Sequence, residues 1–200
     1  MPVYQTGMIE TNQDSPEKTD DELLSAVVNA DEDAFRVLYL RYYERLRQFS
    51  FRMTRRAELV DEVLNDTFFT VWKSAHKFAS RSAVSTWIFG IAYRKCLKAI
   101  ERSDRWYLHH PEMNLDDVLS LSNGPEQTTE EQQLRSRVIQ GLHGLSAEQR
   151  LVFELTHFFG YSYPEIAEVA QCSVNTVKTR MFHARRKLQE SLGNDLGKRV

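Results

Sequence analysis

Residues 146–188 have the sequence SAEQRLVFELTHFFGYSYPEIAEVAQCSVNTVKTRMFHARRKL, and this stretch is the strongest indicator of the fold. Ser162 and Glu165 have the spacing of a capping box, with Pro164 in the first turn, so a short helix should begin at Ser162. Residues 171–172 interrupt its apolar pattern, and Ser173 can cap the next helix. The stretch therefore predicts two short helices, a tight turn and a longer final helix.

The final helix is predicted to be amphipathic and basic. Its apolar residues recur at spacings of three and four: Val174, Val177, Met181, Ala184 and Leu188. Residues 174–189 include no acidic residue, whereas a helix selected only for solubility normally mixes both signs of charge. This arrangement is typical of a helix-turn-helix that places its last helix in the major groove of DNA. The alternative is a basic face that only contacts water.

Charge is distributed unevenly along a chain whose formal net charge is -2. Residues 1–34 contain nine acidic residues and one basic residue, and residues 103–133 contain seven and one. The rest of the chain contains 24 basic and 12 acidic residues. This asymmetry predicts two basic domains that face nucleic acid, with an acidic tail and an acidic linker.

We expect an all-α protein with two small helical domains joined by a flexible linker. The expected parts are an acidic extension over 1–22, a first domain over 23–103, a linker over 104–133, a second domain over 134–192 and a tail over 193–200. No long apolar run or signal peptide is evident, which predicts a cytoplasmic chain without direct membrane binding. Cys96 and Cys172 are expected to be buried and not disulfide-bonded.

Residues 35–102 are predicted to form three helices. Apolar stripes over 35–53 and 60–72 are separated by a polar turn at 55–58. The third helix begins near Ser85 and aligns Arg94, Lys98 and Arg102 on one ridge. Phe89 and Tyr93 flank this ridge, and aromatic rings beside basic groups can hold single-stranded nucleic acid. The other interpretation is that both rings belong to the core.

The sequence also bears on two further classes of protein, enzymes and transcriptional regulators. An enzyme is not predicted, because the sequence contains no Ser/His/Asp set, glycine-rich phosphate loop or metal-ligand spacing. The adjacent His109 and His110 lack a neighbouring cysteine that would complete a metal site, so neither metal nor cofactor is expected. A two-domain helix-turn-helix transcriptional regulator stays open as the alternative function.

Four segments, in this order, resemble the extracytoplasmic-function (group IV) bacterial sigma factors of the sigma-70 family: FRVLYLRYYERL, VDEVLNDTFFTVWKSAHKF, STWIFGIAYRKCLKAIER and the helix-turn-helix stretch. The resemblance spans about residues 35–103 and 134–190. It implies a non-enzymatic factor that binds the clamp and flap of core RNA polymerase, recognises the -35 and -10 elements of promoter DNA and aids promoter melting. It also implies inhibition by a membrane-anchored anti-sigma factor. An ordinary regulator would give no account of the helix over 61–72.

The resemblance also implies three sets of site residues. The polymerase clamp would be bound by Asp61, Glu62, Asn65, Asp66, Phe68 and Trp72, and at least one of the two aromatic residues is expected to be core. The -10 element would be contacted by Ser80, Arg81, Ser82, Phe89, Tyr93, Arg94, Lys98 and Arg102. The -35 element would be contacted by Ser173, Asn175, Thr176, Lys178, Thr179, Arg180, Phe182, His183, Arg185 and Arg186.

Two points qualify these assignments. Relatives commonly have asparagine where this chain has Arg94, and glycine where it has Ala79 or Ser80, so base-specific contacts at Arg94 do not carry over. An arginine can still bind phosphate or stack on a base. His183 is also consistent with a helix residue that does not contact DNA.

Overall fold

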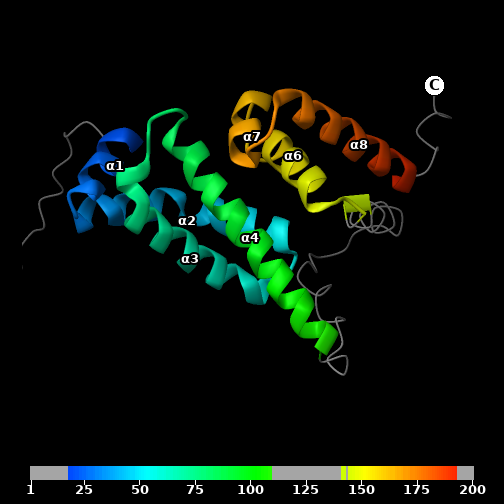
Figure 1. The fold of residues 1–200 in the computed structure, drawn as a ribbon, viewed down its shortest axis with the longest axis horizontal. Coiled ribbons are helices and arrows are strands. Elements are labelled where there is room, and N and C mark those ends of the chain that lie inside the picture. The colour runs from blue at the N-terminus through cyan, green and yellow to red at the C-terminus, as the bar shows by residue number, and fades with distance from the viewer. Residues whose placement is uncertain (1–17, 110–140, 143, 193–200) are drawn as a thin grey trace, which may run out of the picture.

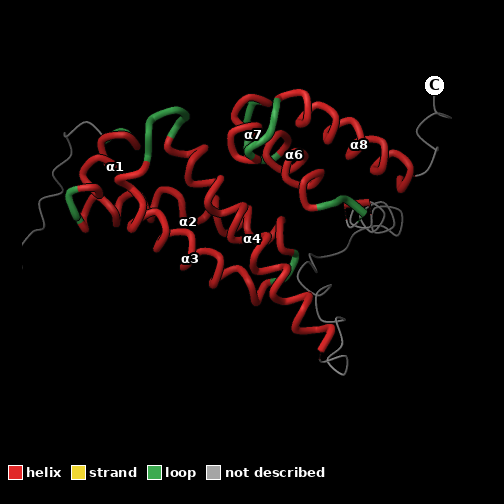
Figure 2. Tube along the Cα trace, viewed as in Figure 1, coloured by secondary structure: helices red, strands yellow, loops and turns green. Residues whose placement is uncertain are grey.

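The computed structural model describes residues 18–109, 141–142 and 144–192, drawn in colour in Figure 1. Within these residues the regular structure is entirely helical (Figure 2), as expected of an all-α protein. The N-terminal part consists of α1 (Asp20–Val28), α2 (Glu32–Thr54), α3 (Val60–Ser74) and α4 (Val84–His109), with short 3-10 turns at Ala57–Leu59 and Ala75–Lys77. The C-terminal part consists of α6 (Ala147–His157), α7 (Tyr163–Ala170) and α8 (Val174–Leu192).

Helix α1 crosses the boundary expected at residue 23. The Thr19 hydroxyl accepts a hydrogen bond from the Glu22 backbone N–H, and the Glu22 carboxylate accepts one from the Thr19 backbone N–H. Asp20, Asp21 and Glu22 occupy the first turn, where negative charge is stabilised by the helix dipole. Part of the acidic segment that suggested an extension is therefore the start of a helix, whose Leu23, Leu24 and Val27 are buried.

Helices α2, α3 and α4 pack together through the apolar stripes that the sequence predicts. The buried residues include Leu38, Tyr42, Leu46, Phe49 and Met53 of α2, Val63, Leu64, Phe68 and Val71 of α3, and Ile88, Ile91 and Ala92 of α4. Helix α2 ends at Arg55, which adopts a left-handed conformation with φ 58°. Helix α4 continues to His109, so residues 104–109, expected to belong to the linker, are helical. The expected linker beyond His109 lies outside the described residues.

Helices α6, α7 and α8 confirm the predicted helix-turn-helix. The capping box of Ser162 and Glu165 is formed, with Pro164 in the first turn of α7. Gln171 ends α7 in a left-handed conformation with φ 51°. The Ser173 hydroxyl then accepts a hydrogen bond of 3.1 Å from the Thr176 backbone N–H at the start of α8. Val177, Met181, Ala184 and Leu188 are buried, which confirms the predicted apolar face of α8.

The N-terminal and C-terminal parts share one hydrophobic core. Buried residues from α1 to α4 and from α6 to α8 belong to the same cluster. Helix α7 packs against α4 and α6 packs against α2, and in Figure 1 α8 lies farther from the N-terminal helices. The sequence predicts two tethered domains but does not predict that they pack together.

Two further expectations concern membranes and thiols. No helix of the described segments is long and apolar enough to cross a membrane. Cys96 is fully buried and Cys172 is half-buried, and both are free thiols. Burial raises the pKa of the Cys96 thiol to about 12.

Candidate partner and nucleic-acid interfaces

The outer face of α3 combines polar groups with one exposed aromatic ring. Asp61, Asn65, Phe69 and Lys73 follow at intervals of four residues, so they lie on one face of the helix, and all are exposed. The Phe69 side chain is 58% exposed, and the Lys73 ammonium lies 4.5 Å from its ring centroid. An exposed ring among polar groups is typical of an anchor at a protein interface.

Phe68 and Trp72, which the resemblance assigned to the polymerase clamp, point to the other side of α3. Phe68 is 3% exposed, and its ring centroid lies 4.3 Å from that of Tyr39. Trp72 is half-buried against Phe35, with 5.0 Å between ring centroids. Phe68 is therefore a core residue, and Phe69 is the exposed aromatic residue that the sequence reasoning missed. Its spacing of four from Asn65 was the available signal.

Two acidic residues of the same expected set form ion pairs with α4. Glu62 pairs with Arg102, and the Asp66 carboxylate lies 3.3 Å from the Lys95 ammonium. Surface ion pairs contribute only about 0–1 kcal/mol to stability, so a partner could replace them at little cost. The pairs also show that Arg102, assigned to the -10 set, faces α3.

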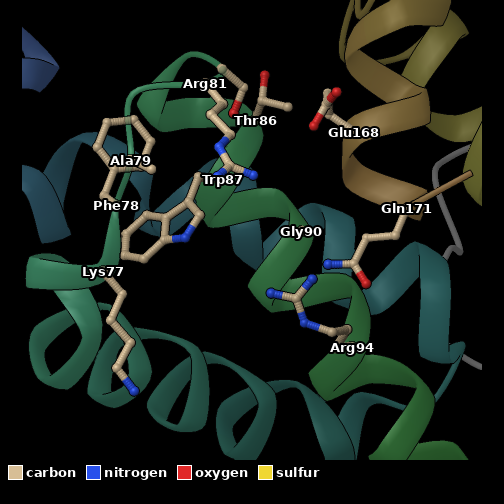
Figure 3. A pocket seen from close by; sticks show the side chains of 11 residues that line it. Lys77, Phe78, Ala79, Arg81, Thr86, Trp87, Gly90, Arg94, Glu168 and Gln171 are labelled. Atoms are coloured by element: carbon tan, nitrogen blue, oxygen red, sulfur yellow. The ribbon is translucent and has the colours of Figure 1, made fainter.

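The loop between α3 and α4 borders a cavity of about 400 Å³ (Figure 3). The lining residues are Lys77, Phe78, Ala79, Arg81 and Ser82 from the loop region, Thr86, Trp87, Gly90 and Arg94 from α4, Glu168 from α7, and Gln171, which follows α7. The Phe78 and Trp87 rings pack together at 5.4 Å. Ser80 is exposed and has a positive φ of 51°. Arg81, Ser82 and Arg94 of the expected -10 set thus line one hollow together with these two rings, whereas Ser80 does not line it.

Phe89 and Tyr93 do not form the exposed aromatic surface that the -10 assignment requires. Phe89 is 0% exposed and Tyr93 is 6% exposed. The Phe89 ring packs against those of Phe159 and Tyr161 in the loop before α7, at 5.3 and 5.2 Å. The interpretation of both rings as core is therefore correct in this conformation, while Lys98 farther along α4 is exposed.

Most residues assigned to the -35 element lie on the outer face of α8. The exposed residues of this set are Ser173 at the N-cap and, along α8, Asn175, Lys178, Thr179, Phe182, Arg185 and Arg186. Phe182 is 63% exposed. Lys178 follows the Ser173 cap by little more than one turn, so it lies near the end of α8 that would enter a groove first.

Several residues of the -35 set have partners within the protein. Ser173 and Thr176 bond to each other at 2.9 Å in the cap of α8. Arg180 is half-buried, and its Nη1 lies 3.6 Å from the Cys172 Sγ. His183 is half-buried beside Phe182, with 5.5 Å between ring centroids. Thr176, Arg180 and His183 are therefore less exposed than the outer face of α8, whereas Ser173 is exposed.

The described segments contain no group of three His, Cys, Asp or Glu residues placed to hold a metal ion.

Comparison with known proteins gives consistent matches across both parts of the chain. The family descriptions "Sigma-70 region 2" and "Sigma-70, region 4" match residues 38–106 and 135–188. The chain is 30% identical over 177 residues to the ECF RNA polymerase sigma factor SigM of Mycobacterium tuberculosis, covering 88% of this chain and 86% of that protein.

Two solved structures are similar in fold. The structure of CnrH in complex with the cytosolic domain of CnrY has a TM-score of 0.62 and 25% identity, covering 84% of this chain and 94% of that chain. The sigma factor RpoE in complex with the anti-sigma factor NepR from Bartonella quintana has a TM-score of 0.63 and 22% identity, covering 80% and 98%. The second likeness is one of fold alone.

Proposed function

Because the chain belongs to the extracytoplasmic-function group of the sigma-70 family, we propose that it binds core RNA polymerase and directs initiation at promoters with particular -35 and -10 elements. The exposed face of α8 is the single observation that carries this proposal. A helix-turn-helix presents a basic surface with Lys178 near its leading end, and that geometry suits the major groove of duplex DNA.

Within α8, the proposal separates base reading from phosphate binding. Lys178 can donate to guanine acceptors, and the exposed Phe182 can contact a thymine methyl group. Arg185 lies nearly two turns beyond Lys178, where a straight helix has left the floor of the groove. Arg185 is therefore assigned to phosphate, which fixes orientation without reading sequence.

The face of α3 formed by Asp61, Asn65, Phe69 and Lys73 is proposed to bind the polymerase clamp. Phe69 supplies an apolar anchor, and Asp61 and Asn65 supply polar contacts around it. The combination of a central ring and a polar rim is how small interfaces concentrate their binding free energy. This face keeps Asp61 and Asn65 of the expected set and adds Phe69 and Lys73.

The loop before α4 and the first turns of α4 are proposed to contact the -10 element. Arg81 and Arg94 can bind phosphate, and the Phe78 and Trp87 rings offer surfaces beside the hollow in Figure 3. Phe89 and Tyr93 can contribute only when the C-terminal part moves away from α4, because they are buried beneath it.

An anti-sigma factor is proposed as the regulatory partner. CnrH was solved in complex with the cytosolic domain of CnrY, and CnrH shares 25% identity with this chain over 84% of its length. The proposal rests on that similarity of sequence and fold.

Competition for core polymerase tests the proposed function. Labelled housekeeping sigma factor is bound to purified core polymerase, and the full chain is then added. A sigma factor displaces the label, because two sigma factors use the same clamp surface. A regulator that acts without replacing a sigma factor leaves the label bound, and that result would refute the proposal.

A further inference from the structure

The hollow in Figure 3 lies at the junction between the N-terminal and C-terminal parts of the chain. Its walls come from the loop before α4, from α4 itself and from the end of α7. Its volume is about 400 Å³, and small-molecule pockets typically have volumes of roughly 300–1,000 Å³. The hollow is therefore large enough to hold a small ligand, separately from any contact with promoter DNA.

Three cations line the hollow without a counter-ion. Lys77, Arg81 and Arg94 are exposed, and within the described residues none of them forms an ion pair. Among the described lining residues, Glu168 is the one carboxylate, so the lining carries an excess of two positive charges. A phosphate monoester carries a charge of about −1.5 to −2 at neutral pH, which matches this excess. The charge of the hollow therefore suits a phosphorylated ligand.

An aromatic surface lies beside these cations. The Trp87 and Phe78 rings pack against each other with 5.4 Å between their centroids, and both side chains are half-buried. Both residues line the hollow, so their rings border the space that a ligand would occupy. Aromatic rings next to basic groups hold nucleotides, because the base stacks on the ring and the phosphate pairs with the cation. The combination favours a nucleotide over a simple phosphate.

The wall at the end of α7 carries polar groups that can recognise a base. Glu168 of α7 and Gln171, which follows it, are exposed, and Figure 3 shows both side chains facing the hollow. Guanine presents two adjacent donors, N1–H and N2–H, which can pair with the two oxygens of a carboxylate. Adenine presents the acceptor N1 at the corresponding position, and a carboxylate repels it. Glu168 therefore favours guanine.

Two local features of the walls are also consistent with a ligand site. Gln171 has φ 51°, a left-handed conformation in which glycine is the usual residue, and its side chain lines the hollow. Thr86 is 1% exposed, and its hydroxyl is buried without a hydrogen-bond partner in the described part of the chain. Buried hydroxyls are normally hydrogen-bonded. A strained backbone and an unsatisfied hydroxyl at one hollow are typical of a site that a ligand completes.

We propose that this hollow is a binding site for a guanine nucleotide. The phosphates are assigned to Arg81 and Arg94, and the base stacks on Trp87 and presents its donors to Glu168. Since Arg81 and Arg94 are also proposed to bind phosphate of the -10 element, the nucleotide and the promoter strand exclude each other. This last consequence rests on the proposed function, whereas the nucleotide site does not.

Isothermal titration calorimetry on the full chain, without polymerase or DNA, tests the site. GDP is the probe, ADP is the matched control with a different base, and inorganic phosphate reports an anion site without base recognition. GDP should bind with a Kd of about 1–100 µM, and ADP at least about tenfold more weakly. Inorganic phosphate should bind more weakly than either nucleotide.

Paired variants assign the two ends of the ligand. Arg94→Ala should weaken GDP and ADP alike by about tenfold, because a charge-assisted contact with phosphate is lost. Glu168→Gln should weaken GDP selectively, so that its advantage over ADP falls below about threefold, because an amide presents only one acceptor to the two guanine donors. Arg36→Ala and Glu58→Gln make the same types of change at exposed residues outside the hollow. Both controls should bind GDP as the wild type does.

Several outcomes overturn the site. They are equal binding of GDP and ADP by the wild type, binding of inorganic phosphate as tight as that of GDP, or equal weakening by Arg36→Ala and Arg94→Ala. Absence of both a binding heat and a rise in Tm at millimolar GDP overturns it outright. If circular dichroism shows that a variant has lost helical content, the comparison of the three ligands on the wild type still decides. Failure of the proposed function is separable, since it appears as failure of the nucleotide-free chain to displace housekeeping sigma factor from core polymerase.

Discussion

Glu154 of α6 and Arg52 of α2 face each other across the junction, 3.3 Å apart, although 102 residues separate them in sequence. The carboxylate is almost wholly buried, whereas the guanidinium is 36% exposed. An ion pair of this kind contributes little net stability, because desolvation offsets much of the attraction, but removal of one partner leaves a buried charge unbalanced. The ion pair therefore specifies how the N-terminal and C-terminal parts pack together, and adds little to the free energy of unfolding.

Lys178→Ala and Arg185→Ala should have different effects on promoter choice. Lys178→Ala should relax the preference at one or two -35 positions by about 1–3 kcal/mol, because a base contact is lost. Arg185→Ala should weaken binding to all promoters alike, because a phosphate contact is lost. The slope of log affinity against log salt concentration should fall in magnitude by about one. Transcription from a randomised -35 library at two salt concentrations measures both. Uniform weakening by Lys178→Ala would exclude it as a base reader.

Asp61→Arg combined with Asn65→Ala should abolish co-purification with core polymerase while the chain stays folded. Both residues are exposed on α3, so the change alters an interface without disturbing the core. Asp21→Arg reverses an exposed charge on α1 and should leave co-purification unchanged. Undiminished binding by the double variant would remove the assignment of α3 to the clamp.

Phe69→Ala should weaken binding to core polymerase by about 2 kcal/mol, or roughly 30-fold, if the ring is the anchor of the α3 face. Its stability should change little, because the side chain is 58% exposed. Phe51→Ala removes another partly exposed ring, from α2, and serves as the matched control. Titration of labelled polymerase with each variant gives the Kd, and equal affinities would rule out Phe69 as an anchor.

Arg55→Gly should stabilise the protein at neutral pH. Arg55 has φ 58°, a conformation that costs a non-glycine residue about 1 kcal/mol. Burial and the Arg150 charge also lower the pKa of Arg55 to about 9. The folded state therefore binds the Arg55 proton less tightly than the unfolded state does. The charged guanidinium lowers the free energy of unfolding below a pH of about 9, and this loss is recovered as the pH rises above about 9.

Thermal unfolding at pH 7 should therefore give a higher Tm for Arg55→Gly than for the wild type. Gln171→Gly relieves a similar backbone conformation, φ 51°, without removing a charge, so it should give a smaller gain. A lower Tm for Arg55→Gly would show that the guanidinium stabilises the junction.

Cys96 should resist alkylation in the native protein at pH 8. Its burial raises the pKa of the thiol to about 12, so the reactive thiolate is scarce as well as inaccessible. Mass spectrometry after brief iodoacetamide treatment should show Cys96 modified only when denaturant is present. Native modification at the same rate as in denaturant would contradict the burial of this side chain.

Local signals in the sequence predict the elements of this fold well. The Ser162 capping box, the interruption at Gln171 and the Ser173 cap depend on neighbouring residues, and all are present. The exposed face of α8 follows from the same helical periodicity. Helix α1 was not predicted from the sequence. The acidic residues of its first turn stabilise a helix N-terminus, but the same composition is also typical of an acidic tail.

Contacts between distant residues could not be predicted in the same way. Phe68 and Phe69 are adjacent in α3. Only the packing of Phe68 against Tyr39 shows that Phe68, and not Phe69, is buried. The Phe89 stripe of α4 is equally compatible with a core face and a nucleic-acid face. Its burial depends on Phe159 and Tyr161, which belong to the other part of the chain.

Run-off transcription tests the central claim most directly. Purified core polymerase, with and without the full chain, transcribes a pool of genomic fragments, and the RNA 5′ ends are sequenced. We predict new start sites that depend on the protein and share upstream -35 and -10 motifs, and loss of these starts with Asp61→Arg/Asn65→Ala. Identical transcripts with and without the protein would contradict its assignment as an initiation factor.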